Sequence, residues 1–420
     1  MSIALVPAPT RFVVRSVAVA DAPNLLSLLD NSGGLSWVTG ASDDQHGIVA
    51  WGEIDRIELE GPERVSRAQR WWSQWTSNAT GDEAIAFASF AFATGPAKSV
   101  VIIPEVLVRR DAKGTSVTAI GTPESIDCLI DNAIARVTRP HELPTQHVAA
   151  SYSDGTRTID EWQAAVDEAI TRINSGELDK VVLARDIVAQ LSEPLNVAAL
   201  LSRLNARFPE CWTFCVDGLV GATPELLIRR QGERVTSRVL AGTVRRSSDH
   251  DRDGALAAAL LGSDKDQEEH SYAVQSVAEA LANHCTDMDV PDEPFILRLA
   301  NVQHLATDVT GELADATPAL ALAASLHPTA AVCGTPTERA KQVIKEIEGM
   351  DRGRYSGPIG WFDTRGDGEF GIALRCALIE NDEATTLRLY AGCGIVAGST
   401  SESEVAESNA KFGAMRDALA

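Results

Sequence analysis

The feature that most constrains this chain is a strand, a glycine-rich stretch and a helix that follow one another near its C-terminal end. Residues 386–391 are rich in branched side chains, which is typical of a β-strand. We expect the stretch containing Gly392 and Gly394 to form a turn. Serines at its end offer N-caps for a helix over about residues 402–419. This order favours a sheet flanked by helices.

Three charged side chains share one face of that predicted helix. Glu404, Glu407 and Lys411 are spaced i, i+3 and i+7, which places them on one side. Two carboxylates and an ammonium beside a glycine turn suit half of a metal-and-anion site. The alternative is an exposed helix whose charges are simply solvated.

The same glycines also match a dinucleotide fingerprint, GxGxxA, over residues 392–397. That interpretation requires a further strand with an acidic residue about 20 positions on. Only one helix remains before the sequence ends, so the interpretation is set aside.

Composition limits the classes of protein to consider. The 420 residues suffice for one large domain or two ordinary ones, and 45% hydrophobic with 23% charged residues is typical of a soluble globular protein. The formal net charge of −22, with no basic block, argues against a nucleic-acid partner. An anionic substrate must therefore meet local cations or a bound metal.

Targeting and cysteine signals point to the cytoplasm. The N-terminal residues lack a basic segment before an apolar run, so we expect no signal peptide, and no apolar run reaches the length of a membrane span. The seven cysteines are scattered, which supports neither a disulfide framework nor a zinc site.

Residues 1–150 contain alternating strands and turns without a cluster of acids, bases or nucleophiles, so we expect a structural N-terminal portion. The clearest elements are strands at 84–93 and 99–109 and a helix at 64–76. A polar connector is expected over residues 139–158.

Residues 151–420 carry the chemistry and alternate between helices and strands. Helices are expected at 159–174, 197–208 and about 264–284. Strands are expected at 180–189, 211–216 and 226–230. The pattern predicts an α/β or α+β architecture with large sheets and flanking helices.

A second carboxylate pair lies at the start of a predicted helix. Asp266 and Glu269 are spaced i and i+3, as are Glu404 and Glu407. Two such helices facing each other suit Mg²⁺, which prefers oxygen ligands and retains several waters. We expect Glu269 and Glu407 to be direct ligands, with Asp266 and Glu404 acting through water. The alternative is a solvated helix start that favours acidic residues.

Two residues are candidates for proton transfer. Lys180 begins an apolar strand, where partial desolvation favours a neutral amine that acts as a base. Glu225 follows a proline and could donate a proton if burial raised its pKa. The alternatives are a strand-flanking surface lysine and a turn-capping glutamate.

Other residues suit an anionic ligand. Ala241, Gly242 and Thr243 are expected in a tight turn whose amides approach a ligand. Tyr355 offers a hydroxyl, and Arg375, expected inside an apolar strand, offers a bidentate fork. His304, taken alone, is more typical of a core histidine than of a ligand-binding residue.

Taken in order, these residues resemble the chorismate-utilising enzymes, which include isochorismate, salicylate, anthranilate and aminodeoxychorismate synthases. The resemblance covers about residues 155–415 and implies a single large α+β domain with two packed β-sheets flanked by helices. It also implies a substrate-binding set and a Mg²⁺ cofactor. That set comprises Ala241, Gly242, Thr243, His304, Tyr355, Arg375, Gly392, Gly394 and Lys411.

Two positions narrow the resemblance. The presence of Lys180 and of alanine at position 241 is similar to the members whose nucleophile is water. The GCGIVAGS stretch looks more like isochorismate synthases than salicylate synthases. Cys393 stands where alanine is common, and we expect it to lie apart from the chemistry. A salicylate synthase and a non-catalytic homologue that binds Mg²⁺ and carboxylates remain the alternatives.

The resemblance implies a mechanism in which Mg²⁺ binds the ring carboxylate of chorismate, while Tyr355 and Arg375 hold the enolpyruvyl carboxylate. Lys180 removes a proton from the water that adds at C2, and Glu225 protonates the hydroxyl that leaves C4. The product, isochorismate, can feed a menaquinone or a siderophore pathway. A monomer without an amidotransferase subunit is expected.

Overall fold

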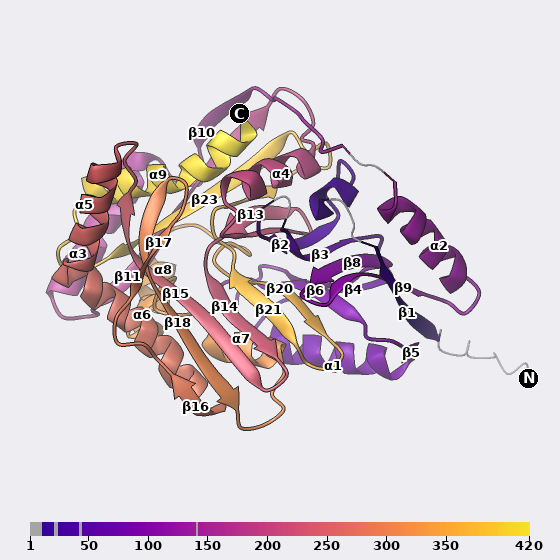
Figure 1. Ribbon diagram of the computed structural model, residues 1–420. Helices are drawn as coiled ribbons and strands as arrows, with labels where there is room; N and C mark the ends of the chain where they lie inside the picture. Colours follow the sequence, from indigo (N-terminus) through magenta and orange to yellow (C-terminus); the bar gives the residue numbers. More distant parts are fainter. Residues whose placement is uncertain (1–10, 21–23, 42–43, 140–141) are drawn as a thin grey trace, which may run out of the picture.

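The computed structural model describes residues 11–20, 24–41, 44–139 and 142–420. Residues 1–10, on which the expectation about a signal peptide rests, lie outside the described residues. The strands gather into two large, mainly antiparallel sheets, here named sheet A and sheet B, and helices cover them (Figure 1). The α+β class and the two-sheet architecture expected from the resemblance are confirmed.

Sheet A has 13 strands within the described ranges. Its spatial order is β10 (Ala150–Asp154), β11 (Lys180–Leu191), β23 (Thr386–Ile395), β22 (Cys376–Ile379), β13 (Leu219–Thr223), β12 (Trp212–Val216), β2 (Leu35–Thr39), β3 (His46–Trp51), β8 (Val106–Asp111), β9 (Gly114–Gly121), β1 (Phe12–Val19) and β5 (Ala79–Gly81), with β19 (Gly334–Thr335) paired to β11.

Sheet B has ten strands in the same part of the chain. Its order is β16 (Cys285–Asp289), β18 (Val302–Leu313), β15 (Arg234–Arg245), β14 (Leu226–Gln231), β21 (Gly368–Ile372), β20 (Pro358–Asp363), β6 (Ile85–Ser89), β7 (Ser99–Ile103) and β4 (Asp55–Leu59), with β17 (Phe295–Arg298) paired to β18.

Helices pack on the outer faces of both sheets. Sheet A is contacted by α2 (Ile126–Val137), α4 (Val197–Arg207) and α9 (Ser401–Leu419). Sheet B is contacted by α1 (Arg64–Ser77), α5 (His250–Leu261), α6 (Asp264–Ala282) and α7 (Ala319–Leu326). Helices α3 (Ile159–Asn174) and α8 (Thr337–Ile347) contact each other and β11, and the short 3₁₀ helix η1 (Leu25–Leu28) packs against α4.

Three hydrophobic clusters correspond to these layers. The cluster between the sheets contains Trp37 and Phe214 from sheet A with Phe87 and Trp361 from sheet B. A second cluster lies under the helices of sheet A, and a third lies under the helices of sheet B. Each sheet is therefore buried on both faces, which explains why many strands are apolar throughout rather than alternating.

The helix expected at 159–174 is α3, with the same bounds. Thr158 and Glu161 form a reciprocal capping box at its start. The single strand expected at 99–109 was wrong: it is two strands, β7 and β8, separated at Pro104, which cannot donate a ladder hydrogen bond. The connector expected at 139–158 contains β10, which pairs with β11.

Two of the segments in which the chain passes from one sheet to the other lie side by side. The chain passes from β13 to β14 through Glu225, and it returns from β21 to β22 through Arg375. The Thr223 hydroxyl donates to the carbonyl of Ile372 at 2.6 Å, and the amide of Ile372 donates to the carbonyl of Glu225 at 3.2 Å. Two candidate site residues therefore lie at the junction of the sheets.

Across the described ranges, no helix combines the length and apolar character needed to cross a membrane. All seven cysteines are unpaired thiols.

Candidate active site

A cavity of about 230 Å³ opens at the junction of the two sheets, beside the N-terminal turns of α6 and α9. Among the residues that line it are all the candidate site residues except Lys180. These are Glu225, Ala241, Gly242, Thr243, Asp266, Glu269, His304, Tyr355, Arg375, Gly392, Gly394, Glu404, Glu407 and Lys411.

Lys180 lies directly behind this wall. It is the first residue of β11, its side chain is 1% exposed, and its Nζ lies 2.9 Å from Oε1 of Glu269. Burial alone would raise the pKa of the Glu269 carboxyl, but the ammonium groups of Lys180, Lys411 and Lys265 outweigh it and hold the pKa below its usual value. Glu269 is therefore ionised at neutral pH.

Gly392 and Gly394 do not form the turn expected from the sequence. They lie within β23, where they pair with Ala184 and Val182 of β11. A Cβ atom at Gly394 would lie 2.6 Å from Oε1 of Glu269 and 3.0 Å from Cε of Lys180. These glycines are needed for clearance rather than for backbone conformation, and the turn follows later, around Gly398.

Helix α9 presents its charged face to the cavity. Thr400, rather than the expected Ser399 or Ser401, is the N-cap. The Lys411 ammonium donates to the carbonyl of Gly392 at 2.7 Å and lies 2.5 Å from Oε1 of Glu407. Burial would lower the pKa of Lys411, but Glu407 reverses this and raises it. Lys411 is therefore a fixed cation in the wall.

Of the α9 pair of carboxylates, Glu404 is more buried than Glu407, and the residue is 4% exposed. Burial, followed by repulsion from Glu407, raises the pKa of Glu404 to about 7. Its Oε2 atom has no hydrogen-bond partner among the described residues. The Cys393 thiol also lies within 4.8 Å of a carboxylate oxygen of Glu404 and of Glu407, but Cys393 is not among the residues that line the cavity, so the expectation that it lies apart from the chemistry stays a prediction.

Glu225 is 5% exposed and faces the cavity from the segment that joins β13 to β14. Burial raises the pKa of its carboxyl to about 8, although Lys180, Arg375 and Lys411 act in the opposite direction. A carboxylic acid that stays protonated at neutral pH can donate a proton.

Ala241, Gly242 and Thr243 lie in β15 rather than in a tight turn. The pairing of β15 with β18 shifts register between Ala241 and Thr243, and Gly242 has a φ of +74°. The register shift is a β-bulge, and the bulge turns the backbone toward the cavity. The sequence around these three residues did not indicate a bulge.

Arg375 is not inside a continuous strand, contrary to expectation, but at the break between β21 and β22, with a φ of +48°. Its Nη2 atom lies 3.3 Å from Nε2 of His304, whose Nδ1 lies 3.0 Å from the Thr243 hydroxyl. Burial, with Arg375 and Lys411 nearby, lowers the pKa of His304 far below its usual value. The neutral ring therefore accepts from Arg375 and carries its proton on Nδ1.

Tyr355 is 4% exposed and lines the cavity. Its ring stacks on Tyr390, with centroids 5.0 Å apart and an interplanar angle of 9°. Burial raises the pKa of the Tyr355 hydroxyl, so the group remains a hydrogen-bond donor.

Two cations of the cavity were missed from the sequence. Lys265 is exposed at the start of α6, where it was overlooked beside Asp266. Arg352 lies in a loop that the sequence analysis did not single out. Its side chain is 3% exposed, and its guanidinium pairs with Glu348 at 2.6 Å. The i, i+4 spacing of Glu348 and Arg352 is a local signal, whereas the contacts with the carbonyls of Val182 and Val332 depend on residues farther away in the sequence.

The four carboxylates fit a hard divalent cation. Asp266, Glu269, Glu404 and Glu407 line one cavity and offer only oxygen atoms. The unpartnered Oε2 of Glu404 is a buried acceptor without a donor, and lysine ammonium groups neutralise Glu269 and Glu407. Buried acceptors of this kind are stabilised by a cation.

The comparisons with known proteins agree with this geometry. The family model described as chorismate binding enzyme matches residues 10–420, so the chain belongs to the family of chorismate-binding enzymes. The resemblance read from the sequence is confirmed.

Within that family, the similar relatives include isochorismate synthases. The isochorismate synthase DhbC of Bacillus subtilis is 41% identical over 272 residues, which cover 62% of this chain and 68% of DhbC. The isochorismate synthase MenF of the same organism is 38% identical over 62% of this chain and 55% of its own length. The structure of MenF, the menaquinone-specific isochorismate synthase from Escherichia coli, superposes with a TM-score of 0.80 at 27% identity, covering 98% of this chain and 95% of that one.

Proposed function

We propose that this chain is an isochorismate synthase, an isomerase that converts chorismate to isochorismate. The observation that carries the proposal is the contrast between Glu225, whose raised pKa keeps an acid available, and the ionised Glu269 paired with Lys180 in the same site. Water addition with loss of a hydroxyl needs one acid and one base at the same ring, and Lys180 and Glu225 supply them.

The cations of the wall suit a substrate with two carboxylates. Arg375 is oriented by His304, and Lys411 is oriented by Glu407 and the carbonyl of Gly392. We assign Arg375 and the Tyr355 hydroxyl to the enolpyruvyl carboxylate. Lys411 and the backbone at Gly242, Thr243, Gly392 and Gly394 border the remaining substrate surface.

In this proposal the Lys180 ammonium first gives up its proton, and the neutral amine then takes a proton from the water that attacks C2. Glu225 gives its proton to the hydroxyl that leaves C4 while the double bonds shift. The proposed cofactor is Mg²⁺, for which Glu269 and Glu407 would be the ligands, supported by Asp266 and Glu404. When bound, the ion would supply a Lewis acid to a substrate carboxylate.

The proposal is tested by analysing the products from chorismate and Mg²⁺ by NMR, with and without ammonium. We expect isochorismate under both conditions, and Glu225→Gln should lower kcat by roughly 10²–10⁴-fold. Salicylate and pyruvate would identify a salicylate synthase instead. An ammonium-dependent aminated product, or no consumption of chorismate, would overturn the proposal.

Removal of divalent ions provides a separate test. Because four carboxylates line one cavity and the Oε2 atom of Glu404 has no hydrogen-bond partner among the described residues, a chelator should abolish turnover, and added Mg²⁺ should restore it. Full activity in chelator would contradict the metal assignment. Glu407→Gln should weaken Mg²⁺ binding measured by calorimetry, which separates metal binding from catalysis.

We further propose that the enzyme acts in the cytoplasm as a monomer without an amidotransferase subunit. A water nucleophile requires no ammonia channel, and seven unpaired thiols fit a reducing compartment. We propose that residues 1–150 have a structural role. Light scattering of the purified protein tests the oligomeric state.

A further inference from the structure

The loop that carries Tyr355 has two adjacent side chains that point in different directions. Tyr355 lines the cavity, whereas Arg354 reaches the hairpin turn between β12 and β13. The loop has no strand or helix of its own here, and Ser356 has a φ of +56°. The position of the Tyr355 hydroxyl therefore depends on what anchors its neighbours.

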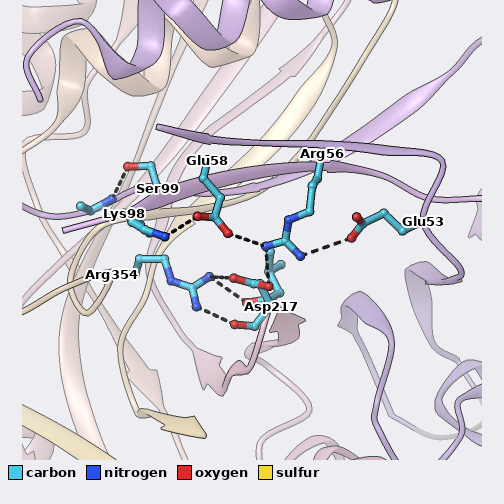
Figure 2. Close-up of polar contacts among 9 residues, drawn as sticks. Glu53, Arg56, Glu58, Lys98, Ser99, Asp217 and Arg354 are labelled. Atoms are coloured by element: carbon cyan, nitrogen blue, oxygen red, sulfur yellow. Dashed lines mark hydrogen bonds and ion pairs between the residues drawn. The ribbon is translucent and has the colours of Figure 1, made fainter. Parts of the chain in front are cut away.

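Arg354 is anchored by the hairpin turn (Figure 2). Its Nη1 donates to the carbonyl of Val216 at 3.1 Å, and its Nη2 donates to the carbonyl of Asp217 at 2.5 Å. The Oδ2 atom of Asp217 lies 3.5 Å from Nη1. One guanidinium thus binds two carbonyls and a carboxylate of sheet A.

The charge of Asp217 is held in place from the other side. Its Oδ1 accepts from Nη2 of Arg56 on β4, a strand of sheet B, at 2.9 Å. Asp217 has a φ of +51°, as the tight two-residue turn Asp217-Gly218 requires. The carboxylate therefore lies between two arginines and joins the two sheets (Figure 2).

Burial makes this contact energetically important for Arg354. The Arg354 side chain is 11% exposed, and burial lowers the pKa of its guanidinium while Asp217 opposes that change. A buried guanidinium is costly unless it is paired. The outer members of the network, such as Lys98 and Glu58 at 71% and 43% exposed, are solvated ion pairs of little energetic weight.

The other end of the loop is anchored independently. Arg352 binds Glu348 and donates to the carbonyls of Val182 and Val332 at 2.7 and 2.9 Å. Arg352 anchors the loop three residues before Tyr355, and Arg354 anchors it at the residue immediately before Tyr355. Without the Arg354 side chain, the Tyr355 ring keeps its stacking contact with Tyr390, and the backbone around it keeps hydrogen bonds such as that from the Ser356 amide to the carbonyl of Ala373, but the anchor to the β12–β13 turn is lost.

We propose that Arg354 and Asp217 are positioning residues that hold Tyr355 in its substrate-binding orientation. The inference rests on the proposed function, because it takes Tyr355 as a ligand of a chorismate carboxylate. Neither residue lines the cavity, so each acts through Tyr355 and not on the substrate.

The test is a double-mutant cycle on the full chain with Mg²⁺. Arg354→Gln and Asp217→Asn should each raise the KM for chorismate about tenfold with kcat nearly unchanged, since a displaced binding group can cost up to about 10²-fold. In a Tyr355→Phe background the same changes should have less than about a twofold effect. Lys98→Gln, at the exposed end of the network, is the matched control and should leave KM unchanged.

Equal effects of Arg354→Gln with and without the Tyr355 hydroxyl would overturn the proposal, as would a lowered melting temperature with an unchanged KM. Asp217→Asn retains the contact between the Asp217 carbonyl and Arg354, and it replaces Arg354→Gln in the cycle if Arg354→Gln does not fold. KM is measured for chorismate consumption whatever the product, and calorimetric Kd replaces it for variants without turnover. A different product from the wild type would therefore refute only the proposed function.

Discussion

Glu225 and Glu269 are two glutamates of one cavity whose surroundings shift their pKa values in opposite directions. Glu225 is buried against the crossing between the sheets, without an ion pair among the described residues, and its pKa is raised to about 8. Glu269 pairs with Lys180, and its pKa is lowered. The same cavity therefore contains one glutamate that can donate a proton and one that carries the negative charge suited to a cation.

The raised pKa of Glu225 has a consequence for stability that is independent of activity. The folded protein keeps this proton up to about pH 8, whereas the unfolded chain loses it near the ordinary glutamate pKa of 4.5. Stability contributed by the group is complete below the unfolded pKa and is lost as pH rises toward the folded pKa. Relative to Glu225→Gln, the melting temperature of the wild type should therefore fall between about pH 5 and pH 9.

The control for this measurement is the same substitution at Glu193, which is exposed. It should change the melting temperature equally at both pH values. A difference between wild type and Glu225→Gln that does not depend on pH would contradict the protonated state assigned to Glu225.

At the scale of elements, β23 shows what the sequence does and does not determine. A strand was expected to end at Ala391 because glycines usually mark turns, yet β23 continues to Ile395. The absence of a side chain at Gly394 provides room for Glu269. Glu269 is more than 100 residues away in the sequence, so no local pattern reveals this contact. Helix α3 was predicted with correct bounds because its capping box and apolar period are local signals.

The same distinction applies to the site. Carboxylate pairs at helix starts could be recognised from spacing, and the order of motifs pointed to the family. The bulge at Gly242 and the break at Arg375 depend on pairing between strands, and the carbonyl contacts of Arg352 depend on distant partners, so the sequence alone did not place them.

Gly394→Ala tests the clearance that β23 provides. Its Cβ would lie 2.6 Å from Oε1 of Glu269, so the carboxylate must shift away from Lys180 and from the cavity. We expect a folded protein with weakened Mg²⁺ binding and strongly reduced kcat, measured by calorimetry and product assay. Wild-type values for both would show that the glycine has no such role.

Gly413→Ala is the matched control for that variant. Gly413 lies in α9, and a Cβ there meets nothing within 4 Å. Alanine in a helix interior is favoured over glycine by roughly 0.5–1 kcal/mol, so this variant should melt slightly higher and keep its activity.

At the scale of the whole molecule, a chain with a net charge of −22 must admit a dianionic substrate. Cations that line the cavity offset this negative charge locally. Lys265 is the exposed one among them, and it makes no ion pair within the described ranges. Exposed charges of this kind act on encounter with the substrate and are screened by salt.

Lys265→Gln should therefore lower kcat/KM severalfold at low ionic strength, at the lower end of the ~10–10³ range of electrostatic steering, with kcat preserved. The difference from wild type should shrink as salt is added. Lys345→Gln, on the exposed face of α8, removes the same charge away from the cavity and should have no such effect. A salt-independent loss would indicate a direct contact instead.

The way the two portions of the chain share both sheets has a consequence for dividing the chain. In each sheet the strands of the N-terminal portion form one block, which joins the strands of the C-terminal portion at one pairing, β12 with β2 in sheet A and β20 with β6 in sheet B. A protease cut in the connector near residue 150 would leave each piece with bare strand edges that attract other chains. We therefore expect the two fragments to remain soluble only while they stay associated, and we expect activity only from the associated pair.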